Sequence, residues 1–535
     1  MEKSKESEKN PLTQGEMCYI PPVAGKIAIA AYNPIPFGQP LTQAAFKQVE
    51  ESGCNCILWN QGHHQVGIDD FNDLCDGLDG TNLKIIMMRA LGKNQYPKLL
   101  NYIDTFKNPR LIGWNVFDEP TYADLFPTAT VSESIPSQGY EDFNFPDSDV
   151  STSADNDTSQ TKPKNFKELY TMARENIIQA NRNIFIYFNL AVLESANLTD
   201  NMKYPAYLNK IKNEYNPPLW SFDSYPVKVN TGSLAWEVRK ETYANIQYFH
   251  DISETSGSPF WAYCLTTPHT VYSNPSNEEN VFPIPRYSGS IYPEPTEGVL
   301  RFQAFTALAY GAKGLVYWTY GQIGDKFSGD SEDNPSLTSF CTEKYFSAPV
   351  NRDGVKTAIW DTVKKINQEI SVYSSMFAQS KGRFLAHLDN PQYYNNLENR
   401  KLILPKGIIT SLTISLYDTG DGNLANGVPS DTARICGVLV SGLQNLNVSG
   451  QYYLVLVNHS PFNGCLVDIQ LKSNAIWQCW LKETREEYPQ SPASGQDIRK
   501  ATLPSLYHFN KPLVAGGYLI IGIKNTGTDM SKYPF

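Results

Sequence analysis

Two adjacent carboxylates, Asp118 and Glu119, end an apolar run and precede a proline in the stretch RLIGWNVFDEP at residues 110–120. Carboxyl groups are common general acids and bases, and an apolar setting can keep one of them protonated. Side chains alternate along a strand, so only one of the two acids can point squarely to one side of it. An acid followed by proline also begins many helices, which is the structural alternative. The strands that surround this motif favour the catalytic interpretation.

Eight apolar segments are predicted strands, and segments with helical periodicity separate them. The first four begin about 28 residues apart. Near-continuous apolar strands that alternate with amphipathic helices are typical of a parallel sheet buried on both faces. Eight such units predict an α/β fold, a closed (β/α)8 TIM barrel. The predicted strands span residues 26–36, 54–60, 83–90, 111–120, 183–191, 219–227, 258–267 and 313–321.

The chain changes character after its last predicted barrel helix. Apolar residues at intervals of three and four between Ile359 and Phe377 predict a helix over 355–379 that packs against the barrel wall. From about residue 380 to 525, polar and apolar residues alternate in short runs broken by Gly, Asn and Pro. This pattern is typical of an all-β antiparallel sandwich. Such a domain either supports the barrel structurally, which we favour, or is an ancillary ligand-binding module.

We therefore expect a flexible tail at residues 1–21, a barrel domain at 22–380 and a β-sandwich domain at 381–535. A long polar loop at 121–165 interrupts the barrel directly after its fourth strand. Such a loop either shapes a substrate cleft or forms a solvated flap. The opening residues are polar and carry no signal-peptide core. We expect an exported protein whose signal segment lies outside this chain.

Composition narrows the class of partner. The net charge of −10 argues against nucleic acid and anionic membrane surfaces, and no apolar run is long enough to span a bilayer. The nine cysteines lack metal-ligand spacing, so we predict no metal and no cofactor. Aromatic residues reach 12%, including 32 Tyr and 9 Trp. Aromatic rings and amides suit polyhydroxylated ligands, although a large core explains the same bias.

The carboxyl ends of barrel strands meet at one mouth, where active sites are built. Aromatic residues on barrel strands more often belong to the core than to a ligand platform. The amides Asn60 and Asn189 are more informative, because a buried amide without a partner is costly. His63 and His64, beyond the second strand, fit hydrogen bonding to substrate or plain exposure better than a metal site. The candidate ligand-binding residues at the mouth are Tyr32, Trp59, Asn60, Arg89, Asp118, Asn189, Tyr225, Trp261, Tyr263, Trp318 and Tyr320.

The chain resembles the (β/α)8 glycoside hydrolases of the clan that includes the β-galactosidases and cellulases. Their acid/base Glu ends strand 4, commonly as N-E-P or D-E-P, and GWNVFDEP matches this pattern at Glu119. More particularly, it resembles Bacteroides-type glycoside hydrolases with a C-terminal β-domain. That similarity spans residues 22–525 and is carried by FDSYP (222–226), ALAYGAKG (307–314), VYWTY (316–320) and LVAGGYLIIGI (513–523). The resemblance implies a glycosidase in which Glu119 is the general acid, with a pKa raised by its apolar surroundings.

One departure from this clan concerns the second catalytic carboxylate. The clan places a nucleophilic Glu at the end of strand 7, but SPFWAYCLTTPH at 258–269 contains none. Asp223, at the end of the sixth strand, is our first choice, because strands 4 and 6 lie about 10 Å apart in a barrel. It would be ionised and act as base or nucleophile. Glu297, which a helix-capping role explains equally well, is the second choice, and Asp118 is the third. The alternative is a carbohydrate-binding protein whose barrel has lost catalysis.

Overall fold

The structure is a computed structural model. It describes residues 25–36, 38–60, 68–88, 108–120, 122–126, 165–179, 184–192, 203–229, 236–239, 241–271, 290–322, 343–345, 347–388, 409–417, 437–472, 477–483 and 506–525. The expected tail at 1–21 and all but the edges of the loop at 121–165 lie outside these ranges. The expected domain limits therefore stay predictions.

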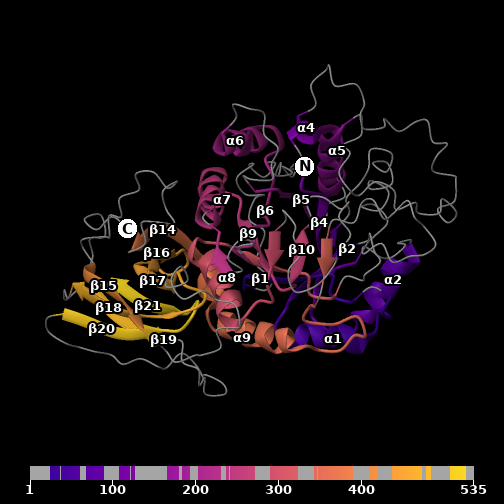
Figure 1. The fold of residues 1–535 in the computed structure, drawn as a ribbon. Coiled ribbons are helices and arrows are strands. Elements are labelled where there is room, and N and C mark those ends of the chain that lie inside the picture. The colour runs from indigo at the N-terminus through magenta and orange to yellow at the C-terminus, as the bar shows by residue number, and fades with distance from the viewer. Residues whose placement is uncertain are drawn as a thin grey trace, which may run out of the picture.

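Eight parallel strands close into a barrel, so the predicted fold class and all eight predicted barrel strands are confirmed (Figure 1). The order around the barrel is β1-β12-β9-β6-β5-β4-β3-β2. The strands are β1 (Ala28–Tyr32), β2 (Cys56–Asn60), β3 (Lys84–Met88), β4 (Leu111–Asp118), β5 (Phe185–Leu190), β6 (Trp220–Phe222), β9 (Phe260–Leu265) and β12 (Gly314–Trp318).

Alternate residues of the barrel strands face opposite sides. Ile57 and Trp59 of β2 belong to the apolar cluster between strands and helices, whereas Cys56 and Leu58 belong to the cluster that fills the barrel. The helix predicted over 355–379 is confirmed as α9 (Ala358–Ala378). The other described helices are α1 (Gln43–Glu51), α2 (Ile68–Gly77), α4 (Tyr122–Leu125), α5 (Phe166–Gln179), α6 (Tyr204–Tyr215), α7 (Thr242–Ser256) and α8 (Glu297–Ala309).

A small antiparallel sheet, the accessory sheet, is built from segments that follow the barrel strands β6, β9 and β12. Its order is β13-β10-β11-β7-β8. Because these segments continue from the carboxyl ends of barrel strands, they belong to the carboxyl-terminal face of the barrel. The strands are β7 (Val227–Val229), β8 (Trp236–Val238), β10 (His269–Val271), β11 (Ser290–Tyr292) and β13 (Glu343–Tyr345).

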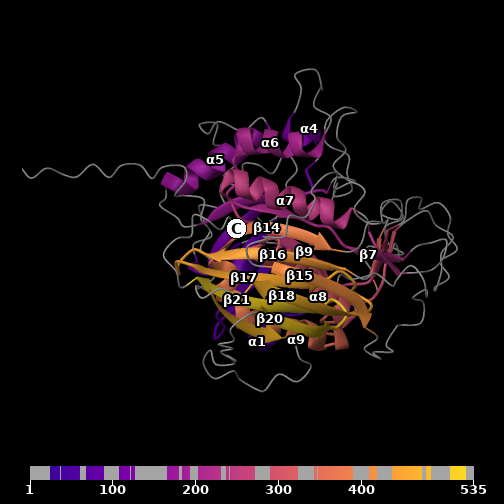
Figure 2. The same ribbon diagram turned by 90° about the vertical axis from the view of Figure 1, so that its left-hand side faces the viewer.

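The C-terminal region is a two-sheet antiparallel sandwich (Figure 2). The inner sheet has the order β14-β16-β17-β21-β19 and the outer sheet β15-β18-β20. The inner sheet is buried on both faces, because Leu439 and Val455 join the cluster that includes the barrel helices while their neighbours Val440 and Leu456 are equally buried. The strands are β14 (Ser380–Leu388), β15 (Ile409–Tyr417), β16 (Val438–Asn445), β17 (Gln451–Asn458), β18 (Gly464–Lys472), β19 (Trp477–Glu483), β20 (Leu506–Leu513) and β21 (Tyr518–Asn525).

The barrel helix α8 lies between the barrel and the inner sheet. All of its residues from Gly298 to Ala309 are buried, as expected for a helix covered on every side. The ring of Phe305 stacks on that of Tyr518 at 3.6 Å, and the Ser441 hydroxyl donates to the Ala309 carbonyl at 2.6 Å. The sandwich therefore completes the burial of a barrel helix.

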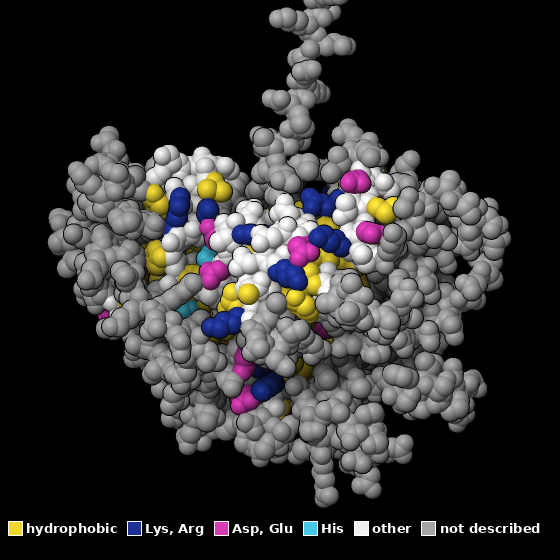
Figure 3. All heavy atoms as spheres, turned by 90° about the horizontal axis from the view of Figure 1, so that it is seen from above, with side chains coloured by type: hydrophobic (Ala, Val, Ile, Leu, Met, Phe, Trp, Pro, Cys, Tyr) yellow, Lys and Arg dark blue, Asp and Glu magenta, His cyan; other side chains and the backbone are white. Residues whose placement is uncertain are grey.

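Charges of both signs are interspersed on the surface. On the face seen from above in Figure 3, the described Lys and Arg side chains lie among Asp and Glu side chains. None of the described helices is long and apolar enough to cross a membrane.

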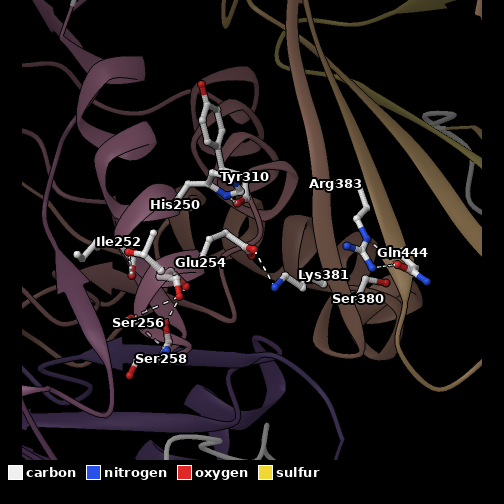
Figure 4. A network of polar contacts seen from close by, with 12 residues as sticks. His250, Ile252, Glu254, Ser256, Ser258, Tyr310, Ser380, Lys381, Arg383 and Gln444 are labelled. Atoms are coloured by element: carbon white, nitrogen blue, oxygen red, sulfur yellow. Dashed lines mark hydrogen bonds and ion pairs between the residues drawn. The ribbon is translucent and has the colours of Figure 1, made fainter. Parts of the chain in front are cut away.

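Polar contacts also join the barrel to the sandwich (Figure 4). Glu254 of α7 forms an ion pair with Lys381 of β14, with Oε2 and Nζ 3.0 Å apart. Nδ1 of His250 donates to the carbonyl oxygen of Tyr310, which follows α8, at 2.7 Å. The junction is therefore polar in part, beside the apolar contacts of α8.

Candidate active site

The end of β4 carries a β-bulge that turns Asp118 toward the barrel interior. Asn115 is opposite Tyr187, and the next pair joins Asp118 with Asn189, so β4 uses three residues where β5 uses two. Bulges re-aim side chains in this way and are common beside active sites. The ring of Phe117 consequently packs outward, 5.3 Å from a ring of α5.

Glu119 follows the strand in a left-handed backbone conformation, with φ of 46°. A residue other than glycine costs about 1–2 kcal/mol in this region, and such strain is frequent at functional sites. Its backbone N–H donates to the carbonyl oxygen of Asn189 at 2.9 Å, which fixes the turn. Glu119 itself is exposed at the barrel mouth.

Asn189 connects the two strands that carry acids. Its Nδ2 donates to Asp118 Oδ1 at 3.1 Å and to Asp223 Oδ1 at 3.2 Å. Its own Oδ1 accepts from the Ser221 hydroxyl at 2.8 Å. Because both N–H groups of the amide are used, this buried side chain orients the acids and has no donor left for a ligand.

Asp223 lies one residue beyond β6, on the same face as Ser221. Burial raises the pKa of Asp223 above its usual value, while the neighbouring side chains of Glu119, Asn189 and Tyr225 lower it in part. The sequence led us to expect a raised pKa on Glu119, which stays a prediction, and the structure shows a raised pKa on Asp223.

The spacing of the two acids decides which chemistry is open to them. Retaining glycosidases hold their carboxyl groups about 5–5.5 Å apart and inverting ones about 6.5–9.5 Å. Glu119 is exposed and Asp223 is half-buried, so Glu119 is the acid with room to move.

Aromatic rings border the acid pair. Tyr225 is stacked on Trp318 with ring centroids 5.4 Å apart, and Trp318 is half-buried. Tyr32, at the end of β1, lies edge-on to Tyr263 at 6.2 Å. The structure thus brings these four predicted residues together in the cluster that fills the barrel.

Buried polar groups lie beneath the acids. The hydroxyls of Tyr187 and Tyr263 and Nδ2 of Asn115 have no hydrogen-bond partner among the described residues. Burial raises the pKa of Tyr187 well above its usual value, and the Asp118 carboxylate raises it further. Burial likewise raises the pKa of Tyr263, with added contributions from Tyr187 and Asp118. The neutral hydroxyls of these tyrosines therefore persist at all physiological pH values.

Three predicted aromatics lie away from the acid pair. Trp59 and Tyr320 belong to the cluster between the barrel and its helices, because they face outward. Trp261 is the second residue of β9 and fills the barrel core, where its ring lies 5.9 Å from that of Phe185. The side chain of Asn60, together with Arg89, His63 and His64, lies outside the described residues.

Glu297 lies in an ion-pair network between α8 and α9. It pairs with Arg301, and its Oε2 is 2.9 Å from Lys365 Nζ. Arg301 is buried and also pairs with Glu369 at 2.8 Å. These contacts give Glu297 a structural position on the outer helices, and we assign it no catalytic part.

Sequence analysis missed Ser221, Asn115 and Tyr187. The alternation of strand residues was the available signal for Ser221, since it precedes Asp223 by two positions. Tyr187 likewise precedes Asn189 by two positions. Asn115 precedes the bulge in β4, where alternation breaks, so alternation gave no signal for it.

No family model matches the chain, and no curated protein matches it. Solved structures with a similar fold include the β-galactosidase of Marinomonas ef1, at 10% identity over 65% of this chain with a TM-score of 0.34. This chain spans 60% of that protein's length. A β-glucosidase of Thermotoga maritima in complex with noeuromycin matches at 10% identity over 65% of this chain and 98% of its own, with a TM-score of 0.34.

Barrels of other activities match at a similar level. A mutant tryptophan synthase α-subunit of Pyrococcus furiosus has 12% identity over 59% of this chain and 96% of its own, with a TM-score of 0.28. Glycoside hydrolases are thus among the similar structures, but these likenesses are too distant to assign a function.

Proposed function

We propose that this protein is a glycoside hydrolase that cleaves an oligo- or polysaccharide with the carboxyl pair of Glu119 and Asp223. The observation that carries the proposal is the meeting of acids from two strands around Asn189 at the barrel mouth. Asn189 Nδ2 donates to Asp118 at 3.1 Å and to Asp223 at 3.2 Å, and the Asn189 carbonyl accepts from the backbone N–H of Glu119 at 2.9 Å. Glycosidic hydrolysis needs one protonated and one ionised carboxyl group. Neighbouring carboxyl groups in different surroundings can hold both forms, and burial raises the pKa of Asp223.

The surroundings of each acid suggest its part. Glu119 is exposed, so it can protonate a leaving group that departs toward solvent. Asp223 lies deeper and keeps a neutral donor, Asn189 Nδ2, at 3.2 Å. That donor stabilises the ionised form that attacks the sugar or activates water. In this scheme Glu119 carries the catalytic proton and Asp223 is ionised when the substrate is bound.

The aromatic border supports a sugar ligand. The half-buried ring of Trp318 is stacked on Tyr225 on one side, and Tyr225 also contacts the acid pair. Stacking of an apolar sugar face on such a ring leaves the hydroxyl groups of the sugar to the carboxylates.

The test compares leaving groups. Glu119→Gln keeps the size of the side chain but removes its proton, so kcat on an oligosaccharide should fall by at least about 100-fold. An aryl glycoside with an activated leaving group needs less protonation and should lose less. The control is Glu294→Gln, an exposed glutamate before α8, which should leave both rates unchanged.

Equal losses on both substrates would contradict the acid assignment of Glu119. A wild-type protein that binds oligosaccharides without hydrolysing any of them would instead support the alternative, a carbohydrate-binding protein on the same barrel.

A further inference from the structure

Three polar groups in the barrel interior are buried without a hydrogen-bond partner among the described residues. They are the hydroxyls of Tyr187 and Tyr263 and Nδ2 of Asn115, which come from β5, β9 and β4. None of the three residues is more than 4% exposed. A buried polar group without a partner is costly, so a cluster of three requires an explanation.

The register of the strands places these groups in consecutive layers of the barrel, since alternate strands contribute the side chains of one layer. The rings of Tyr187 and Trp261 share one layer and lie 6.5 Å apart. Two layers nearer the mouth, the rings of Tyr32 and Tyr263 lie 6.2 Å apart. Asn115 is opposite the inward-facing Tyr187 in the pairing of β4 with β5, so its side chain belongs to the layer between them.

The layer of Asn115 is lined by short side chains. Barrel layers are usually filled by bulky branched residues. Here the other three members are Leu58, Ser221 and Val316, so two of the four side chains are short and polar. Short side chains reach less far toward the barrel axis, and this layer is therefore where a small polar molecule fits best.

The two phenols keep their protons and lie within electrostatic reach of each other. Burial raises the pKa of Tyr263, and Tyr187 and Asp118 raise it further. Burial also raises the pKa of Tyr187, and Asp118 adds to this rise. Each hydroxyl can therefore donate one hydrogen bond and accept others.

We propose that Tyr187, Tyr263 and Asn115 bind one internal water molecule beneath the acids. Buried waters typically make about three hydrogen bonds to polar groups that lack other partners. The amide N–H of Asn115 donates to the water, and each phenol donates or accepts. Water fits better than a sugar hydroxyl, because all three groups are buried below the layer that faces the mouth. The inference does not rest on the proposed function.

A high-resolution crystal structure of the full chain tests the site directly. We expect a density peak about 2.7–3.2 Å from Nδ2 of Asn115 and about 2.5–3.0 Å from both phenol oxygens. The peak should stay in place in crystals soaked with an oligosaccharide. Phenols that bond to each other or to Asn115 with no peak between them would overturn the proposal, and so would a sugar hydroxyl at the position of the peak.

Thermal unfolding tests the site in solution. Loss of a hydroxyl that bonds to water is destabilising, whereas loss of a buried hydroxyl without a partner is neutral or stabilising. Tyr187→Phe and Tyr263→Phe should each lower the unfolding temperature by about 1–4 °C. The double variant should lose less than the sum of the two, because both phenols act through one water molecule.

The matched control is Tyr317→Phe, which changes another buried tyrosine of a barrel strand. Its hydroxyl donates to Oδ1 of Asn367 at 2.6 Å, on the side of the barrel wall that faces the helices. Tyr317→Phe should lower the unfolding temperature to a similar extent, and its loss should add to that of Tyr187→Phe. A loss in this control beside unchanged or higher unfolding temperatures for Tyr187→Phe and Tyr263→Phe would contradict the proposal. Fully additive losses for Tyr187→Phe and Tyr263→Phe would contradict it too.

Discussion

The amide of Asn189 holds two carboxylates that would otherwise repel each other. Its Nδ2 reaches Asp118 and Asp223, and its own orientation is fixed by the Ser221 hydroxyl. Hydrogen bonds to charged groups contribute about 1.5–3 kcal/mol each to stability. Such a residue affects both the fold of the site and the ionisation of its acids.

Asn189→Ala should therefore lower both stability and activity. The free energy of unfolding should fall by about 2–3 kcal/mol, since two carboxylates lose a donor. Guanidinium denaturation measures this change, and Ser221→Ala serves as control because it removes only the hydroxyl that orients the amide. Its cost should be about 1 kcal/mol. An equal cost for the two variants would mean that the Asn189 donors do not stabilise the acids.

Residue positions were predictable where alternation holds and uncertain where it breaks. The acids Glu119 and Asp223 were found because they follow apolar strands. Trp59 and Asn60 could not both face inward, and Trp59 faces the helices. The bulge in β4 was not visible in the sequence, because the extra residue has no composition of its own.

At the scale of elements, α8 and α9 are joined by a buried cation. Arg301 makes two hydrogen bonds to Glu369, at 3.0 and 2.8 Å, within the layer between the barrel and the sandwich. A buried charge that loses its partner is costly, whereas a partly exposed partner contributes little. The two glutamates that contact Arg301 should therefore differ in importance.

Glu369→Gln should destabilise the protein by about 3–5 kcal/mol, and Glu297→Gln by less than about 1 kcal/mol. Burial raises the pKa of Glu297, but Arg301 and Lys365 outweigh it and lower the pKa below the usual value. Its small contribution is therefore present above the pKa of the unfolded chain and is lost as pH falls. Denaturation at pH 7 measures both variants. Loss of hydrolysis in Glu297→Gln without loss of stability would return Glu297 to the candidate acids.

Long elements were predictable and short ones were not. The barrel strands and α9 carry enough apolar residues to show their period, and the structure confirms them. The strands of the accessory sheet are three residues each, too short for any alternation to show. Their pairing depends on contacts between segments far apart in the chain, such as Ile291 with Val229.

At the scale of the whole molecule, two histidines meet where the barrel joins the sandwich. Nδ1 of His387 lies 3.2 Å from Nε2 of His459, and Nε2 of His387 lies 2.7 Å from the Tyr310 hydroxyl. The Tyr243 ring of α7 covers both imidazoles at 4.9 and 5.1 Å. Burial lowers the pKa of His387 to about 3. Burial also lowers the pKa of His459 well below its usual value, and the neighbouring His387 lowers it further.

These histidines should make the protein acid-sensitive. At pH 7.5 and above both are largely neutral in the folded and unfolded states, because the pKa of an unfolded histidine is about 6.5. At lower pH the unfolded chain binds protons first, so the free energy of unfolding should fall by up to about 1.4 kcal/mol per pH unit for each histidine. Denaturation at pH 7.5, 6 and 5 measures the slope. His387→Gln removes one titrating group and should flatten it, while the carboxylates titrate alike in both proteins. Parallel slopes for the two proteins would contradict this expectation.

The central claim is that Asp223 and Glu119 together hydrolyse a glycosidic bond, and Asp223→Asn tests it most directly. This change keeps size and most hydrogen bonding but removes the charge that attacks the sugar or activates water. Turnover of an oligosaccharide and its affinity, measured by product analysis and calorimetry on the same compound, give the answer. We predict turnover lower by at least about 1,000-fold with little change in Kd. Wild-type hydrolysis that survives Asp223→Asn undiminished would contradict the account.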